Sequence, residues 1–183
     1  MGSKSRHAKE LLSVMMKRRK DQQYFVDPFV GGANVVDKVS GNVIASDINP
    51  YLMCMWKAVS EEGWIPPKDI SEVEYKQIRD NKDLLPITAY VGFALSYAGK
   101  FFGGYYKDNI GKRNYSHEAY RNAMIQFPKL SHVRFFHTSY DQLKKPNKSI
   151  IYCDPPYSNT TKYSGDKFDT PIFWEWSENK VKE

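Results

Sequence analysis

The stretch Ser149-Ile150-Ile151-Tyr152-Cys153-Asp154-Pro155-Pro156-Tyr157 contains an apolar run that ends in an acid, two prolines and an aromatic residue. The apolar run predicts a buried strand, and the prolines end it because they hold the chain extended and remove backbone N–H donors. In parallel α/β sheets, ligands bind beyond the carboxyl ends of the strands. The Asp154 carboxylate and the following carbonyl therefore offer two acceptors beside an aromatic face, a combination that suits a planar amine.

A second strand end of this kind occurs near the N-terminus. Tyr24-Phe25-Val26 is a short apolar run that leads into Asp27-Pro28-Phe29-Val30-Gly31-Gly32. We expect a strand, a glycine turn and then a helix, with the glycines allowing a ligand to approach the backbone closely. Residues 42–46 predict the next strand, which ends at Asp47. A carboxylate there can accept both hydroxyls of a ribose, so Gly31, Gly32 and Asp47 predict a nucleoside site.

The remaining elements predict a Rossmann-like, mostly parallel α/β sheet that carries a helical insertion. Helices are expected over residues 6–19, 50–59, 71–80 and 87–97, from an N-cap at Ser116 to about residue 127 and near the C-terminus, with a strand over residues 133–137. The texture of the sequence changes at Pro66-Pro67. We therefore expect residues 1–60 and 126–183 to form the main domain and residues 61–125 the insertion.

The composition excludes several classes of protein. The chain has 183 residues with 41% hydrophobic and 26% charged residues, which is typical of a globular protein. No apolar run is long enough for a membrane helix, the first residues lack a secretory signal, and a reducing cytoplasm is expected. The two cysteines exclude a disulfide scaffold, and the four histidines show no metal-ligand spacing with them, so no metal site is expected.

Charge and aromatic content favour a nucleic-acid partner. The net charge is +6, and 13 tyrosines, 10 phenylalanines and 4 tryptophans accompany it. Residues 99–115 are broken by glycines, aromatic and basic, which predicts a loop or hairpin. Lys100, Lys107 and Lys112 are candidates for phosphate contacts, Arg113 for reading a guanine edge, and Phe101 or Tyr105 for a wedge in the base stack.

The glycine turn and the Asp-Pro-Pro-Tyr motif together resemble the DNA adenine-N6 methyltransferases of the Dam-like group, which use S-adenosylmethionine. Gly2-Ser3-Lys4 is similar to the end of the family's N-terminal motif, residues 25–32 to its cofactor loop and residues 46–49 to its ribose-binding strand end. The resemblance implies methylation of double-stranded DNA, including in restriction–modification systems. It does not indicate an oligomeric state or a target sequence.

The resemblance also implies roles for single residues. It places Lys4 near the cofactor carboxylate, Asp27 and Gly31 near the methionine portion and Asp47 at the ribose, with Phe29 and Gly32 in the same loop and Phe136 and His137 flanking the cofactor adenine. Asp154, Pro155, Pro156 and Tyr157 are then the catalytic residues. Acceptance of N6 hydrogen bonds by Asp154 and the Pro155 carbonyl localises the amine's lone pair, and Tyr157 stacks on the flipped base.

Other interpretations stay open at this point. A cytosine-N4 methyltransferase relies on similar physics, although the families in question more often carry serine at the position of Asp154. An N-methyltransferase that acts on RNA or on protein is also compatible, because the motif specifies a planar amine more than a polymer, although the basic aromatic loop favours nucleic acid. Only 26 residues follow Tyr157, whereas the family normally continues with further strands. A truncated, catalytically inactive DNA-binding remnant is therefore the main alternative that is not an enzyme.

Overall fold

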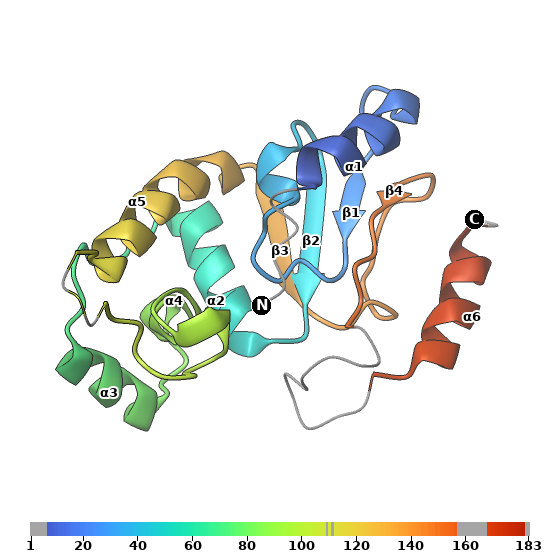
Figure 1. Cartoon of the computed structure of the whole chain (residues 1–183). Helices are drawn as coiled ribbons and strands as arrows, with labels where there is room; N and C mark the ends of the chain where they lie inside the picture. Colours follow the sequence, from blue (N-terminus) through green and yellow to red (C-terminus); the bar gives the residue numbers. More distant parts are fainter. Residues whose placement is uncertain (1–6, 109, 111, 157–167, 182–183) are drawn as a thin grey trace.

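Four parallel strands form the sheet in the computed structural model, which describes residues 7–108, 110, 112–156 and 168–181. The strands are β1 (Phe25–Asp27), β2 (Val43–Asp47), β3 (Val133–His137) and β4 (Ile150–Ile151), in the spatial order β3-β2-β1-β4 (Figure 1). Phe25 pairs with Val43 on one side and with Ile150 on the other. The predicted mostly parallel α/β sheet is therefore confirmed. Lys4 and Tyr157 lie outside the described residues.

Burial along the strands follows their place in the sheet. All three residues of β1 are buried, and β2 is buried up to Ser46, as expected for central parallel strands covered on both faces. The outer strand β3 buries Val133 and Phe135 but exposes Arg134 and Phe136, so one of its faces meets solvent. The apolar runs in the sequence thus identified β1 and β2, because a strand that is buried on both faces needs apolar residues along its length.

The strand order creates a switch point at β1. The chain runs from β1 to β2 and then to β3 on one side of β1, and it returns to β4 on the opposite side. A crevice forms outside the carboxyl ends of two strands whose connections diverge in this way, and it is the usual ligand position in open α/β sheets. The topology therefore locates the candidate site beyond the ends of β1 and β4.

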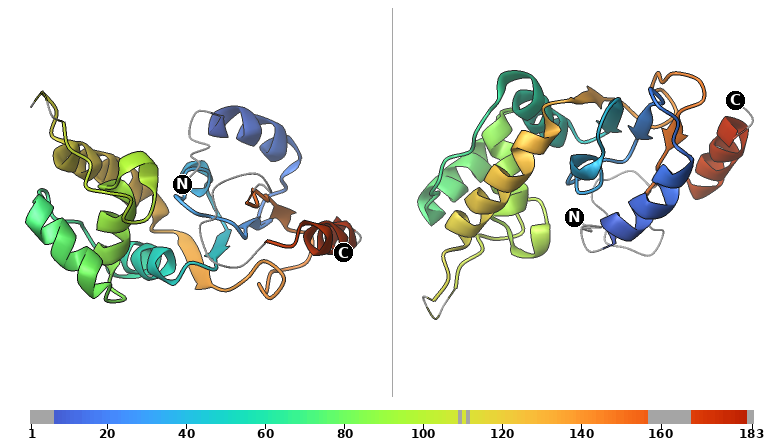
Figure 2. Two further views of the ribbon diagram at one scale, coloured as in Figure 1. Left: turned by 60° about the horizontal axis from the view of Figure 1, so that its bottom comes forward. Right: turned by 90° about the horizontal axis from the view of Figure 1, so that it is seen from above.

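Six α-helices occur in the described part of the chain, and most of them gather on one side of the sheet. They are α1 (Ala8–Met15), α2 (Pro50–Lys57), α3 (Glu72–Asn81), α4 (Pro86–Ala94), α5 (Tyr115–Gln126) and α6 (Thr170–Val181). Figures 1 and 2 show α2–α5 beside β3 and α6 on the opposite side, beyond β4. Helix α2 packs against both α4 and β3, which joins the helical cluster to the sheet. None of these helices has the length and apolar character needed to span a bilayer.

Two local predictions were wrong. The helix expected after the glycine turn is a single 3-10 turn, Val36–Lys38, because Gly31 and Ala33 take positive φ angles that an α-helix cannot contain. The N-cap of α5 is Asn114, whose side chain accepts the His117 N–H at 3.0 Å. Ser116 instead lies inside the first turn, buried, where its hydroxyl accepts the Ile70 N–H at 2.9 Å.

Candidate functional site

Three acidic side chains meet at the carboxyl edge of the sheet. Asp27 ends β1, Asp47 ends β2, and Asp154 follows β4 by three residues. The charges of Asp47 and Asp154 both help to raise the pKa of Asp27, so each of these two carboxyl groups lies close enough to Asp27 to interact with it. The parallel sheet therefore brings together residues that the sequence singled out from segments more than 100 positions apart.

Asp27 is the most deeply buried of the three. Its exposed fraction is 2%, and its Oδ1 accepts the Phe29 N–H at 3.1 Å. Burial, followed by the neighbouring carboxylates, raises the pKa of Asp27 from 3.8 to about 8. The group therefore carries a proton at neutral pH and releases it when a positive charge arrives beside it.

Asp47 closes the glycine turn from the neighbouring strand. Its Oδ2 accepts the Gly31 N–H at 3.0 Å, and its Oδ1 accepts the Asn49 N–H at 2.9 Å. Burial raises the pKa of Asp47, while backbone hydrogen bonds and then the nearby His137 lower it. Each carboxylate oxygen has capacity for a further hydrogen bond, so Asp47 can hold the turn and a ligand hydroxyl together.

The turn that follows β1 is held from several directions. Its backbone is unusual because Gly31 has φ +45° and Ala33 has φ +57°. The Trp56 indole N–H donates to the Gly31 carbonyl at 2.8 Å, and the Gln126 side-chain amide donates to the Gly32 carbonyl at 2.9 Å. The sequence analysis did not identify Trp56 or Gln126, because neither residue lies near the turn in the sequence.

The end of β3 adds a polar and an aromatic side chain to the same edge. His137 is opposite Asp47 in the parallel register, and its Nε2 lies 3.0 Å from the Ile48 carbonyl oxygen. Phe136 is opposite Ser46 and is 41% exposed. His137 thus lies beside Asp47, whereas the Phe136 side chain points to the other face of the sheet, because successive residues of a strand alternate between faces.

The segment after β4 places Asp154 beside β1. The Tyr152 N–H donates to the Val26 carbonyl at 2.8 Å, which continues the parallel pairing one residue beyond the strand. Asp154 and Pro155 are half-buried, and Pro156 is exposed. Burial raises the pKa of the Cys153 thiol to about 12, so this cysteine is a packed thiol and not an activated nucleophile.

An aromatic cluster covers the Phe29 side chain. Its ring centroid lies 5.3 Å from that of Tyr140, 5.8 Å from that of Phe168 and 5.6 Å from that of Phe173. Phe173 belongs to α6 and is 3% exposed. The Phe29 ring therefore joins α6 and the β3–β4 connection to the turn, and the sequence analysis had not assigned Tyr140 or Phe173 to this region.

Residues 99–115, the predicted DNA-contacting segment, are called the arm, and this segment projects from the helical cluster (Figure 2). The Tyr106 and Tyr115 rings stack with centroids 3.9 Å apart, and the Arg113 guanidinium lies 4.8 Å from the Tyr115 centroid. The Asp108 carboxylate accepts the backbone N–H groups of Ile110, Lys112 and Arg113. These contacts join residues 106–108 to the described residues that follow them in the arm.

The basic residues of the arm differ in their environments. Lys107 pairs with Glu72 at 2.9 Å, and Arg113 makes two hydrogen bonds to Glu118, at 2.9 and 2.6 Å. Lys100 and Lys112 are exposed, and no described carboxylate lies within ion-pair distance of either. Lys100 and Lys112 are thus the better placed of the predicted phosphate contacts, while Arg113 would have to exchange Glu118 for a base edge.

The two rings predicted as wedges pack inside the insertion. Phe101 lies against Tyr51 and Phe93, with ring centroids 5.1 and 4.8 Å away. The Tyr105 hydroxyl donates to the Ile70 carbonyl at 2.7 Å, and its ring contacts Tyr75. Neither ring extends freely from the arm, so the structure gives both a packing role.

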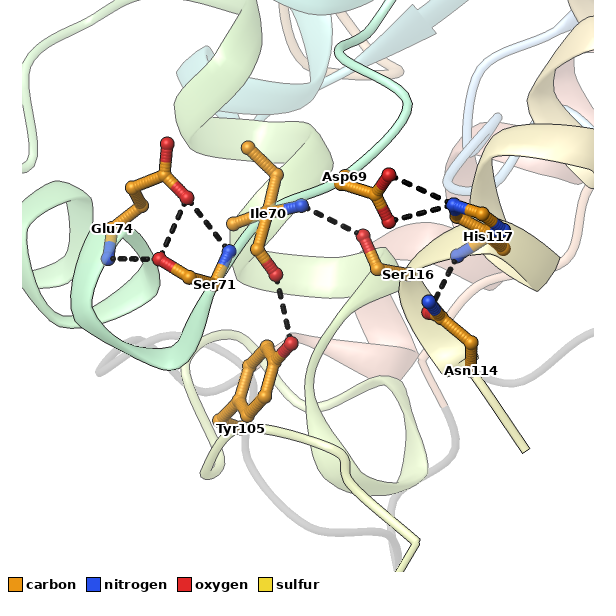
Figure 3. A network of polar contacts seen from close by, with 8 residues as sticks. All are labelled: Asp69, Ile70, Ser71, Glu74, Tyr105, Asn114, Ser116 and His117. Carbon is orange, nitrogen blue, oxygen red and sulfur yellow. Dashed lines mark hydrogen bonds and ion pairs between the residues drawn. The ribbon is translucent and has the colours of Figure 1, made fainter. Parts of the chain in front are cut away.

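A polar network fastens the base of the arm to helices α3 and α5 (Figure 3). Ser71 and Glu74 form a capping box at the start of α3. The next contacts along the network are Tyr105 with the Ile70 carbonyl, the Ile70 N–H with Ser116, and His117 Nε2 with Asp69 at 2.8 Å (Figure 3). Hydrogen bonds therefore connect the two ends of the arm through the segment that precedes α3.

Comparisons with known proteins agree with this geometry. Residues 1–85 match the family of D12 class N6 adenine-specific DNA methyltransferases. The match contains β1, the glycine turn and Asp47, and it ends before β3 and Asp154. It confirms, over these residues, the resemblance predicted from the sequence. A search of curated proteins found no match.

Proposed function

We propose that this chain, whose first 85 residues match the D12 class N6 adenine-specific DNA methyltransferases, transfers a methyl group from S-adenosylmethionine to N6 of adenine in duplex DNA. The observation that carries the proposal is the convergence of Asp27, Asp47 and Asp154 at one edge of the parallel sheet. Two of these acids suit a cationic nucleoside, and the third suits an amine. Their proximity would bring a methyl donor and an acceptor side by side.

The described residues fit the proposed cofactor. S-adenosylmethionine, when bound, supplies a methyl group on a positively charged sulfur. The buried Asp27 offers a carboxyl group that becomes negative beside a cation, and Asp47 offers acceptors to ribose hydroxyls. His137 lies beside Asp47 and is proposed to contact the adenine ring, and Phe136 is proposed as its second contact on the family resemblance alone. Lys4, which lies outside the described residues, is proposed at the cofactor carboxylate on the family resemblance alone.

Asp154 is the proposed catalytic residue on the acceptor side. The exocyclic N6 of adenine is a weak nucleophile because its lone pair is delocalised into the ring. Hydrogen bonds from N6 to the Asp154 carboxylate and to the Pro155 carbonyl would localise that lone pair, and the negative charge would stabilise the positive charge that develops on N6. Pro156 holds the segment extended. Tyr157 is proposed as the stacking partner of the flipped base.

We assign the DNA contact to the insertion, residues 61–125, with residues 1–60 and 126–183 as the catalytic part. The arm projects away from the helical cluster, and its exposed Lys100 and Lys112 would contact phosphates (Figure 2). In duplex binding, the logarithm of the binding constant falls with the logarithm of the salt concentration. Substitution of Lys112 by alanine should reduce the magnitude of this slope by about one unit if Lys112 contacts one phosphate. A slope that does not respond to Lys100 or Lys112 would place the DNA elsewhere.

Methyl transfer from labelled cofactor to duplex DNA tests the proposal directly. Asp154→Asn should lower the rate by roughly 10²–10³, because it keeps an acceptor but removes the charge, and Asp154→Ala should lower it further. Asp141→Asn, in the β3–β4 connection, is a matched control for loss of one carboxylate. Each variant is also tested for cofactor binding by calorimetry. Transfer by Asp154→Ala at the parent rate would refute the assigned role.

The product identifies the acceptor. After the reaction the DNA is digested to nucleosides, and N6-methyladenine and N4-methylcytosine are quantified by mass spectrometry. N6-methyladenine as the product supports the proposal, while N4-methylcytosine, or methylation of RNA only, would replace it. Cofactor binding by the parent without transfer would favour the alternative of an inactive DNA-binding protein.

A further inference from the structure

We infer that Trp56 and Gln126 are positioning residues that hold the glycine turn in the shape the proposed cofactor site requires. The inference rests on the proposed function, since it concerns the same site. Trp56 donates to the Gly31 carbonyl at 2.8 Å, and Gln126 donates to the adjacent Gly32 carbonyl at 2.9 Å. The two donors come from different helices, α2 and α5, and reach neighbouring peptide groups.

The turn needs such support because of its sequence. Glycine populates many backbone conformations, and two glycines in succession carry a large entropy cost when they are fixed in one. Ala33, which follows them, has a positive φ of +57°, a strained conformation for a residue with a Cβ. On the β2 side, Asp47 accepts the Gly31 N–H at 3.0 Å. Trp56 and Gln126 fix the opposite, carbonyl side of the same turn.

Trp56 is itself rigidly placed. It is 3% exposed, and its ring lies between Phe127, at 5.6 Å, and Phe135, at 6.1 Å between centroids. The indole N–H is its only hydrogen-bond donor, and in this position the donor points to the Gly31 carbonyl. The core therefore fixes the position of the donor for the half-buried Gly31 carbonyl, and the net hydrogen bond favours the turn that accepts it.

Gln126 connects the turn to the insertion. It is the last residue of α5, and the next residue, Phe127, packs on Trp56. Helix α5 begins at Tyr115, where the arm ends. The helix that follows the proposed DNA-contacting segment therefore ends with a hydrogen bond to the proposed cofactor turn.

Preorganisation gives the expected effect. A turn already held in the binding shape does not lose entropy when a ligand binds, so its affinity is higher. A net hydrogen bond of about 1 kcal/mol corresponds to about a fivefold change in an equilibrium constant. We expect the dissociation constant for S-adenosylmethionine to rise about fivefold in each single variant. Since both residues hold one turn, the double variant should deviate from the product of the two effects.

Two conservative substitutions test the inference. Trp56→Phe keeps an aromatic ring in the core but removes the N–H, and Gln126→Met keeps the length of the side chain but removes the amide. Trp64→Phe is the matched control for the first, because Trp64 also packs on Phe127 but has no hydrogen bond to the turn among the described residues. Gln77→Met, on the exposed face of α3, is the control for the second.

The readouts separate positioning from general stability. In both variants KM for the cofactor should rise while kcat at saturating cofactor and the affinity for DNA stay at parent values, and neither control should change KM. Hydrogen exchange of the Gly31 amide, which needs no cofactor, should accelerate in both variants and in neither control. If the parent binds no S-adenosylmethionine, the proposed function fails, and the amide exchange alone decides the positioning role. Unchanged exchange in both variants would overturn the inference.

Discussion

Replacing Asp27 by asparagine should change how the stability of the protein depends on pH. Burial raises the pKa of Asp27 from 3.8 to about 8 in the folded protein. Between about pH 4 and about pH 8 the folded state therefore holds a proton that the unfolded state has released. The free energy of unfolding consequently falls as the pH rises through this window, and the contribution of the protonated acid is lost above about pH 8.

The size of the pH effect on the free energy of unfolding follows from the single proton that Asp27 holds. One bound proton changes the free energy of unfolding by at most about 1.4 kcal/mol per pH unit. Asparagine is neutral at every pH, and its side-chain oxygen can still accept the Phe29 N–H that Asp27 now accepts at 3.1 Å. Asp27→Asn should therefore remove the slope without removing this hydrogen bond. The variant should gain stability relative to the parent as the pH rises.

Urea denaturation at a series of pH values measures the difference. The free energy of unfolding is determined for the parent, for Asp27→Asn and for Asp21→Asn, an exposed carboxylate that serves as the control. The expected result is a difference between Asp27→Asn and the parent that grows between about pH 5 and about pH 8. A constant difference over that range would refute the buried, protonated Asp27.

Cofactor binding gives the same carboxyl group a second readout. A cationic ligand favours the ionised form of Asp27, so S-adenosylmethionine binding at neutral pH should release a proton. Calorimetry in buffers with different ionisation enthalpies counts the protons released. Asp27→Asn should release fewer protons than the parent, and equal proton release would remove Asp27 from the binding site.

Three further changes have defined outcomes. Gly92→Ala should lower the free energy of unfolding by about 1–3 kcal/mol despite the better helix propensity of alanine, because the new Cβ would lie 2.4 Å from a ring carbon of Phe101; denaturation measures it. Asp47→Asn should lower the free energy of unfolding by about 1–3 kcal/mol even without cofactor, since the two carboxylate oxygens accept the Gly31 and Asn49 N–H groups and asparagine has only one acceptor oxygen. Cys153, with a pKa of about 12, should react with iodoacetamide on the order of 10²-fold more slowly in the folded than in the unfolded protein, followed by mass spectrometry.

Local chemistry made most secondary structure predictable. Residues 133–137 were expected as a strand and form β3. The segment contains a β-branched residue and two aromatic residues, which are enriched in strands. The prediction after Gly31-Gly32 was wrong because apolar valines there fit a helix and a packed turn equally well. The backbone angles at Gly31 and Ala33 exclude the helix, and the turn makes hydrogen bonds with Asp47, Trp56 and Gln126, which lie elsewhere in the sequence.

In the arm, too, the sequence predicted the general character of the segment, and the tertiary structure decided the environment of each side chain. Its aromatic and basic composition predicted a nucleic-acid contact, and the structure places exposed lysines on it. The sequence could not show which rings pack and which project. Gly92 leaves the space that the Phe101 ring fills, and Ile70 supplies the carbonyl that holds Tyr105. Both partners come from other parts of the insertion, so composition alone overestimated the number of side chains that project from the arm.

The sequence by itself determined which chemical groups end the strands: an acid and a glycine turn after β1, an acid after β2, and Asp-Pro-Pro-Tyr after β4. These features are local, because a strand end, a turn and a proline act on their own neighbours. Only the tertiary structure decided that Asp154 lies beside Asp27 and that Gln126 reaches Gly32 over 94 positions. The physical reason is the pairing of β4 with β1, which places distant strand ends at one edge and sets the burial, and hence the pKa, of the carboxyl groups there.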